Sequence, residues 1–232
     1  MRKKILFLAG MMACSSWAGA QEISKTWVAD KGNGTYQNPV LHADYSDPDV
    51  CAAGDDFYMT ASSFNCIPGI PILHSNDLVN WSLVNCALPI QEPEEFFDKA
   101  QHGKGVWAPA IRFHNGEFYI YWGDPDYGIY MIKTKDPKGK WSKPVLVKAG
   151  KGMIDATPLW DEDGKVYLIH AYAGSRSGVN SILVICELNP EGTEVISDPV
   201  MVFDGNDGKN HTVEGPKLYK RNGYYYIFAP AG

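Results

Sequence analysis

Three carboxylic acids precede prolines at similar places along the chain. Asp47 lies one residue before a proline, Asp155 three residues before another, and Glu214 two residues before a third. A fourth proline of this kind follows Trp107 by two residues. Carboxyl groups can take up and release protons, and the flat apolar face of an indole suits a sugar ring. If the fold brings these four residues together, they form a pocket with three acids and one aromatic wall.

Such a set of residues matches the needs of one reaction. Cleaving a glycosidic bond with inversion requires one carboxylate to activate water and one carboxylic acid to protonate the leaving oxygen, about 6.5–9.5 Å apart. A third acid nearby adds negative charge and keeps the proton donor protonated near neutral pH. Asp-Pro and Glu-Gly-Pro are also ordinary turn sequences, but three acids at the same phase of a repeat favour the chemical interpretation.

The prolines belong to a repeat that must position these side chains. In each copy the proline is followed by a glycine six or seven residues later and then by a tyrosine. The four copies are Pro48-Gly54-Tyr58, Pro109-Gly116-Tyr119, Pro158-Gly164-Tyr167 and Pro216-Gly223-Tyr226. Each glycine lies in a polar turn and precedes a run rich in β-branched and aromatic residues. Every copy is therefore predicted to be a β-hairpin.

Further strands are expected between the hairpins. Similar turns recur at residues 75–81 and 134–141, and the apolar run at 181–195 has the corresponding place in the third copy. Four antiparallel strands in each unit of about 40–60 residues indicate an all-β fold of the β-propeller type. A β-sandwich is the alternative, but it does not demand this repeat. The fourth unit stops at Gly232, so we expect about three and a half blades and a fragment of a longer chain.

The N-terminus has the three-part pattern of a secretory signal. A basic start is followed by an apolar run and by small residues that end at Ala20. We therefore expect a signal peptide over residues 1–20, a linker over 21–37 and the propeller domain over 38–232. The mature protein is predicted to be periplasmic or extracellular, without a membrane span.

Composition narrows the expected partners. The chain has 232 residues and a formal net charge of −6 at pH 7. A phosphate backbone would be repelled, which argues against nucleic acid. No cysteine–histidine spacing suggests a zinc site, and no cofactor or metal is expected. Four cysteines follow the signal segment, at positions 51, 66, 86 and 186; we expect buried free thiols, although sequence cannot exclude any pairing.

Several motifs together resemble glycoside hydrolase family 43. They are YSDPDV with GDDFY, SSFNCIPGIPILHSNDLVNW, GVWAPAI, MIDATPLW and VEGPKLY. The resemblance extends from about Asn38 to Gly232. It implies a five-bladed β-propeller and inverting hydrolysis of β-xylosides, α-L-arabinofuranosides and related linkages.

The resemblance also implies roles for single residues. Asp47 matches the general base, Glu214 the general acid, and Asp155 the residue that orients the acid and raises its pKa. Trp107 and Phe64 match aromatic residues that line the sugar site. The implied substrate is a xylo- or arabino-oligosaccharide from plant cell walls.

Two other functions stay open at this stage. One is a non-catalytic or inactive, truncated propeller that binds glycan without cutting it. The other is an endo-arabinanase on the same fold.

Overall fold

The computed structural model describes residues 26–232, and the predicted signal peptide lies outside this range. The described part is built almost entirely from β-strands, with two single-turn helices. In chain order the elements are β1 Asp49–Ala53, β2 Asp56–Thr60, β3 Gly69–Ser75, β4 Ser82–Leu88, α1 Glu94–Phe97, β5 Ala110–His114, β6 Glu117–Asp124, β7 Gly128–Thr134, β8 Val145–Ala149, β9 Met153–Trp160, β10 Val166–Tyr172, α2 Gly174–Ser177, β11 Ile182–Leu188, β12 Val200–Asp204, β13 Lys217–Arg221 and β14 Tyr224–Phe228.

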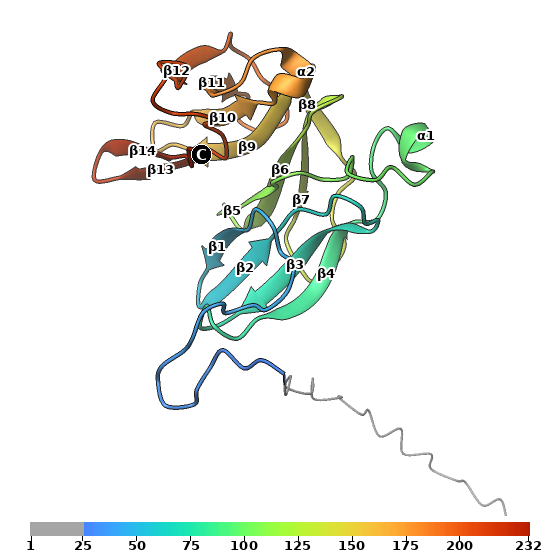
Figure 1. Cartoon of the computed structure of the whole chain (residues 1–232), viewed down its shortest axis with the longest axis vertical. Helices are drawn as coiled ribbons and strands as arrows, with labels where there is room; N and C mark the ends of the chain where they lie inside the picture. Colours follow the sequence, from blue (N-terminus) through green and yellow to red (C-terminus); the bar gives the residue numbers. More distant parts are fainter. Residues whose placement is uncertain (1–25) are drawn as a thin grey trace, which may run out of the picture.

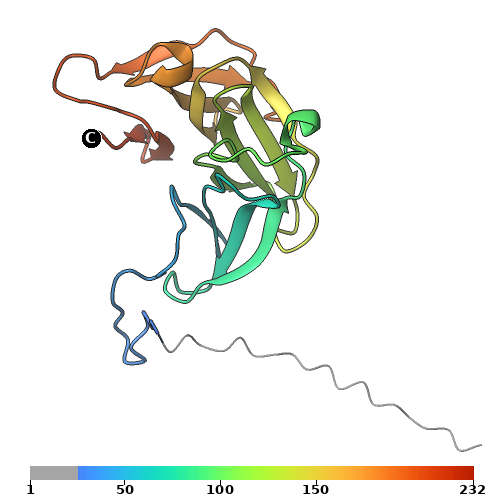
Figure 2. The same ribbon diagram turned by 45° about the vertical axis from the view of Figure 1, so that its right-hand side comes forward.

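The strands form sheets in strict chain order. Strands β1–β4, β5–β8 and β9–β12 each make one four-stranded sheet, and β13 pairs with β14 in a hairpin. All the pairs between these strands are antiparallel. The sheets follow one another along an arc, from the blue-green blade through the orange blade to the red hairpin (Figures 1 and 2). This arrangement confirms the predicted propeller type of about three and a half blades.

Each repeat glycine lies where a strand pair turns. The four glycines all have positive φ, namely Gly54 (66°), Gly116 (78°), Gly164 (85°) and Gly223 (79°). Glycine adopts this backbone conformation without the steric cost that other residues incur. The first two strands of every blade are therefore joined by the hairpin that the repeat predicts.

Apolar side chains between the sheets hold neighbouring blades together. One core cluster joins the first two blades and includes Ile72 of β3 and Trp122 of β6. A second joins the second and third blades around Tyr121 and Leu168, and a third connects the third blade to β13 through Leu218. The first strand of each sheet packs beside the first strand of the next, β1 on β5, β5 on β9 and β9 on β13. The inner strands are thereby fixed relative to one another.

The structure differs from the sequence predictions in three details. The last strand of the third blade, β12, begins at Val200, beyond the predicted run 181–195. Helix α2 was not predicted from the sequence. The expectation of four buried thiols is correct for Cys186 alone: Cys51 and Cys86 are half-buried, and Cys66 is exposed because it lies in the loop between β2 and β3. None of the four described cysteines is in a disulfide.

Within residues 26–232, no helix is long and apolar enough to cross a membrane.

Candidate active site

Asp47 lies in the loop that leads into β1 and has a left-handed backbone conformation, with φ of 52°. Its carboxyl oxygen Oδ2 accepts hydrogen bonds from the hydroxyls of Ser62 (2.6 Å) and Ser46 (3.0 Å). The Ser62 hydroxyl also accepts a hydrogen bond from the backbone N–H of Ala108 (2.8 Å). Two hydroxyl donors thus orient one oxygen of an exposed carboxylate and leave the other for solvent. Sequence analysis did not identify Ser62.

Asp155 is in the middle of β9 and almost fully buried, with 7% of its surface exposed. The register shows that Asp155 and Ala156 together face the single residue His170 of β10, which is a β-bulge. One carboxyl oxygen accepts a hydrogen bond of 2.7 Å from the backbone N–H of Gly215. Burial, and then the charges of Glu214 and Asp47, raise the pKa of Asp155 to about 6 against this hydrogen bond. The bulge explains why this acid lies three residues before its proline.

Glu214 lies directly before Gly215, in the segment that enters β13. The residue is exposed as a whole, but partial desolvation of its carboxyl and the charge of Asp47 raise its pKa. Asp155 in turn is influenced by both Glu214 and Asp47. The charge of Asp47 acts on both Glu214 and Asp155, and Gly215, the residue after Glu214, is hydrogen-bonded to Asp155, so the three predicted acids lie near one another. They come from the first, third and fourth blades.

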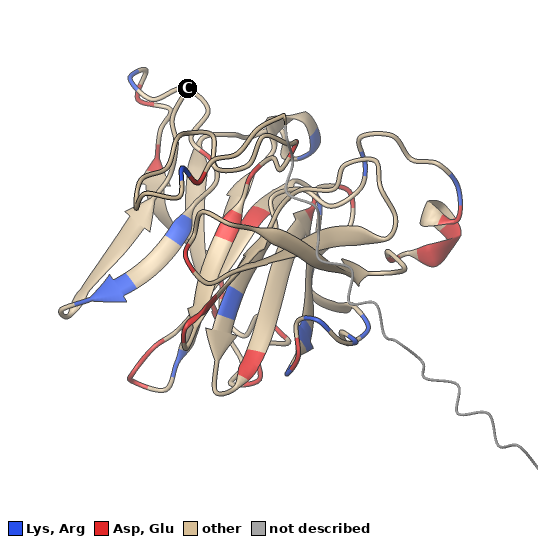
Figure 3. Cartoon of the chain, turned by 90° about the horizontal axis from the view of Figure 1, so that it is seen from below, with Lys and Arg blue, Asp and Glu red and all other residues tan. Residues whose placement is uncertain are grey.

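Basic side chains accompany the acids, and sequence analysis did not identify them. The buried carboxylate of Asp49 in β1 accepts hydrogen bonds from the Arg112 guanidinium (2.6 Å) and from the backbone N–H of Ile111 (2.8 Å). The ammonium of Lys217 in β13 lies 3.8 Å from the other Asp49 oxygen. Burial lowers the pKa of Lys217, while Asp49, Asp155 and Asp47 oppose this shift. Acidic and basic bands are interspersed on the strands near the middle of the molecule (Figure 3).

The two predicted aromatic residues lie beside each other. The rings of Phe64 and Trp107 meet edge to face, with centroids 6.2 Å apart. The indole N–H of Trp107 donates to the carbonyl of Gly103 (2.9 Å). The guanidinium of Arg176 lies over the Trp107 ring at 5.9 Å and pairs with Asp126 at 3.2 Å. Arg176 thus belongs to the same wall as the two aromatic rings.

The arrangement gives carboxyl groups that lie close together different surroundings. Asp47 is solvent-accessible and oriented by hydroxyl donors, which suits a base that activates water. Glu214 has a raised pKa, which suits a proton donor, and its neighbour Asp155 is buried. An exposed carboxylate beside a carboxyl group with a raised pKa is the arrangement expected of an acid–base pair. Within residues 26–232 no three His, Cys, Asp or Glu side chains are grouped so that they could hold a metal ion.

The fold is that of a β-propeller, with three acids from different blades near one another at one end. The family model for glycosyl hydrolases family 43 matches residues 36–232. The chain therefore belongs to glycosyl hydrolase family 43.

Individual relatives agree with this assignment. A beta-xylosidase of Formosa agariphila is 33% identical over 97% of this chain and 40% of its own length. The non-reducing end alpha-L-arabinofuranosidase BoGH43B of Bacteroides ovatus is 34% identical over 85% of this chain and 36% of its own length. Among solved structures, a GH43_12 protein retrieved from a capybara gut metagenome superposes with a TM-score of 0.71 at 32% identity, over 84% of this chain and 38% of that one. The chain thus spans about two fifths of the length of these relatives.

Proposed function

We propose that this chain carries the catalytic acids of an inverting glycosidase that cleaves xylosidic or arabinofuranosidic bonds in plant cell-wall fragments. Asp47 is the general base that activates water, Glu214 the general acid that protonates the leaving oxygen, and Asp155 the residue that keeps Glu214 protonated. The observation that carries the proposal is the proximity of these acids from three different blades: the N–H of Gly215, next to Glu214, donates to the buried Asp155 carboxyl (2.7 Å), and the charge of Asp47 acts on both acids. A binding module has no need to crowd like charges into one pocket.

The substrate class is proposed from the relatives, whose names include beta-xylosidase and non-reducing end alpha-L-arabinofuranosidase. The aromatic wall of Phe64 and Trp107 supports a sugar ligand, because aromatic faces pack against the apolar face of a sugar ring. Export is part of the proposal and is supported by the basic, apolar and small-residue pattern of the first twenty residues. Plant cell-wall polysaccharides lie outside the cytoplasm, so an enzyme that acts on them has to be exported.

Hydrolysis by the full-length protein tests the proposal. Aryl β-xyloside and aryl α-L-arabinofuranoside are assayed with the parent protein and with Asp47→Asn, which keeps the shape of the side chain but removes the base. We expect turnover of at least one substrate, and a loss of about 10²-fold or more in the variant. Asp44→Asn, at an exposed acid three residues earlier, is the matched control and should behave like the parent. Glycan binding without turnover by the parent would instead support a non-catalytic propeller.

A further inference from the structure

A single hydroxyl group, that of Ser62, connects the proposed base to the aromatic wall. Its oxygen lies 2.6 Å from Oδ2 of Asp47 and 2.8 Å from the backbone nitrogen of Ala108, the residue after Trp107. We propose that Ser62 is a positioning residue for Asp47. It holds the carboxylate so that Oδ1 alone takes the proton of the attacking water, at a fixed place relative to the wall. The proposal rests on the proposed function and adds a residue to it.

The direction of the Ser62 hydroxyl proton follows from its two partners. A hydroxyl group has one proton to donate and lone pairs with which to accept. The backbone N–H of Ala108 can only donate, so it occupies a lone pair of the Ser62 oxygen. An ionised carboxylate can only accept. The hydroxyl proton is therefore directed to Asp47.

This proton makes the two oxygens of the Asp47 carboxylate different. Oδ2 accepts from Ser62 and also from the adjacent Ser46 hydroxyl, at 3.0 Å. Among residues 26–232, no hydrogen bond reaches Oδ1. The oxygen Oδ2 is thus occupied by two donors, and Oδ1 is the oxygen left to accept a proton from water.

Backbone contacts on both sides fix the position of Ser62 itself. Its N–H donates to the carbonyl of Ser46 at 2.9 Å, in the loop that leads into β1. The next residue, Ser63, donates its N–H to the carbonyl of Val106 at 2.9 Å and forms a β-bridge with it. Ser62 is therefore held between the loop of the proposed base and the segment that enters β5.

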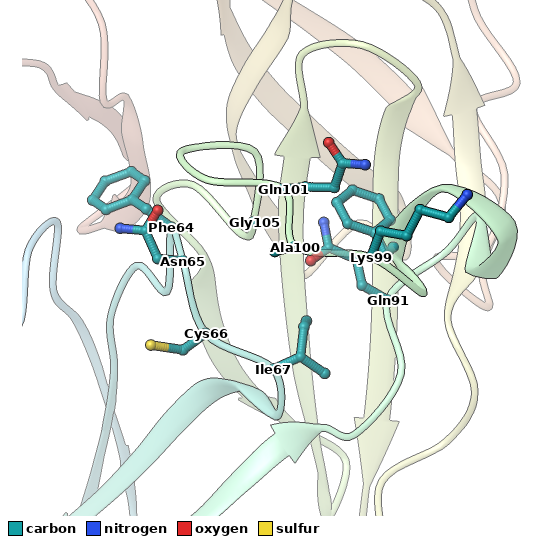
Figure 4. A pocket seen from close by; sticks show the side chains of 10 residues that line it. Phe64, Asn65, Cys66, Ile67, Gln91, Lys99, Ala100, Gln101 and Gly105 are labelled. Atoms are coloured by element: carbon teal, nitrogen blue, oxygen red, sulfur yellow. The ribbon is translucent and has the colours of Figure 1, made fainter.

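The two segments stay together beyond this point. The N–H of Gly105 donates to the carbonyl of Phe64 (2.8 Å), and the N–H of Gly103 donates to the side chain of Asn65 (2.7 Å). Figure 4 shows Phe64 and Asn65 on one segment and Gly105 on the other. The carbonyl of Gly103 also accepts the indole N–H of Trp107 (2.9 Å). The same pair of segments thus anchors the aromatic wall and the serine that contacts the base.

Both residues that Ser62 joins have an unusual backbone conformation. The φ angle is 52° at Asp47 and 35° at Ala108, in the left-handed region that residues with a Cβ atom rarely adopt. Such strain persists only where the surroundings enforce it, and it concentrates at functional sites. The Ser62 oxygen contacts the side chain of one strained residue and the backbone of the other. This coincidence supports a positioning role over an ordinary loop contact.

Loss of the hydroxyl should affect turnover more than substrate binding. In the full-length protein, Ser62→Ala leaves the Asp47 carboxylate without its stronger donor. We expect kcat on an aryl glycoside to fall about 10–100-fold with little change in KM. Ser62→Thr keeps the hydroxyl and should recover most of the parent rate. Ser82→Ala, at the first residue of β4, is the matched control and should behave like the parent.

A double-mutant cycle shows whether Ser62 acts through Asp47. In Asp47→Asn the base is already absent, so adding Ser62→Ala should change the residual kcat by no more than about twofold. A residue that only supports the fold would lower kcat by the same factor in both backgrounds.

Three results would overturn the proposal: a parent-like kcat in Ser62→Ala, no recovery in Ser62→Thr, or an equal loss in the two backgrounds. Failure of the proposed function has a different signature. The parent protein would then hydrolyse no glycoside, or Asp47→Asn would keep the parent rate.

Discussion

Three carboxyl groups close together in this protein have different surroundings. Asp47 is exposed and receives two hydroxyl hydrogen bonds, Asp155 is buried, and Glu214 is partly desolvated next to the Asp47 charge. Burial and like charge both favour the protonated form of a carboxyl group. Burial of Asp155 and partial desolvation of Glu214 therefore raise the pKa of both carboxyl groups.

If Glu214 is the proton donor, the rate loss caused by its replacement should depend on the acidity of the leaving group. We expect Glu214→Gln to lower kcat/KM on unactivated oligosaccharides by about 10²–10⁴-fold, the usual contribution of a general acid. The loss should shrink on aryl glycosides with acidic phenols, since these leaving groups need little protonation. Steady-state kinetics over a series of aryl leaving groups measures this. An equal loss across the series would contradict the assignment.

The buried acid should reduce stability when it is ionised. The pKa of Asp155 is about 6 in the folded protein against 3.8 for the free group, so the folded state binds more protons between these pH values. The free energy of unfolding therefore falls as pH rises from about 4 to about 6. Asp155→Asn removes the charge but keeps an acceptor for the Gly215 N–H. We expect it to gain about 1–3 kcal/mol over the parent at pH 7 and little at pH 4.

Urea unfolding at the two pH values measures this difference. The matched control is Asp163→Asn, an exposed acid in a turn of the same blade. A gain for Asp155→Asn that is equal at both pH values would argue against a buried carboxylate as its origin.

At the scale of the elements, the inner strands bring opposite charges together. Strand β13 packs beside β9, and its residue Lys217 also reaches Asp49 of β1. Its residue Tyr219 lies under the guanidinium of Arg112 from β5, at 5.3 Å. One strand thus connects the inner strands of the other three blades. Lys217 lowers the pKa of Asp155 and offsets part of the repulsion among the acids.

Removal of this positive charge should change the pH profile. In Lys217→Met the buried Asp155 carboxyl loses the nearby cation that lowers its pKa, so the pKa of Asp155 rises further. We expect the limb of the kcat/KM profile that follows the ionisation of Asp155 to move up by about 0.5–1 pH unit. Lys217→Arg keeps the charge and should restore the parent profile. Superimposable profiles for the parent and Lys217→Met would show that Lys217 does not act on the acids.

Next to the aromatic pair Phe64 and Trp107, the backbone at Gly105 lies very close to the backbone at Ser63. A Cβ atom added to Gly105 would lie 2.3 Å from the carbonyl oxygen of Ser63, so the two segments must separate. We expect Gly105→Ala to destabilise the protein by about 1–3 kcal/mol. It should also weaken sugar binding, because the Phe64 ring shifts relative to Trp107. Thermal unfolding and calorimetry measure the two effects. Gly103→Ala, with no atom near its Cβ but a positive φ, controls for backbone strain alone.

At the scale of the molecule, the repeat made the fold predictable. The spacing of proline, glycine and tyrosine reflects a local cause, the left-handed glycine turn of each hairpin, so the blades could be found from the sequence alone. The same repeat predicted that Asp47, Asp155 and Glu214 lie at equivalent positions in their blades. The bulge at Asp155 was not predictable, because it depends on pairing with β10 rather than on neighbouring residues.

The missed residues share a physical reason. Ser62, Arg112 and Lys217 reach the site through contacts between segments at least 15 residues apart in the chain. No local spacing records such contacts. The short-range sequence pattern therefore predicted the blades and their acids. The rest of the site depends on packing between distant segments and was not predicted.

The configuration of the first product is the most direct test of the central claim. Acids from three blades that activate water on one side of the sugar and protonate the leaving oxygen on the other must invert the anomeric centre. The full-length protein is mixed with a β-xyloside, or an α-L-arabinofuranoside if only that is cleaved, and early time points are recorded by proton NMR before mutarotation. The account predicts α-xylose, or β-arabinofuranose, as the first product. Initial release of the sugar in its original configuration would contradict the account.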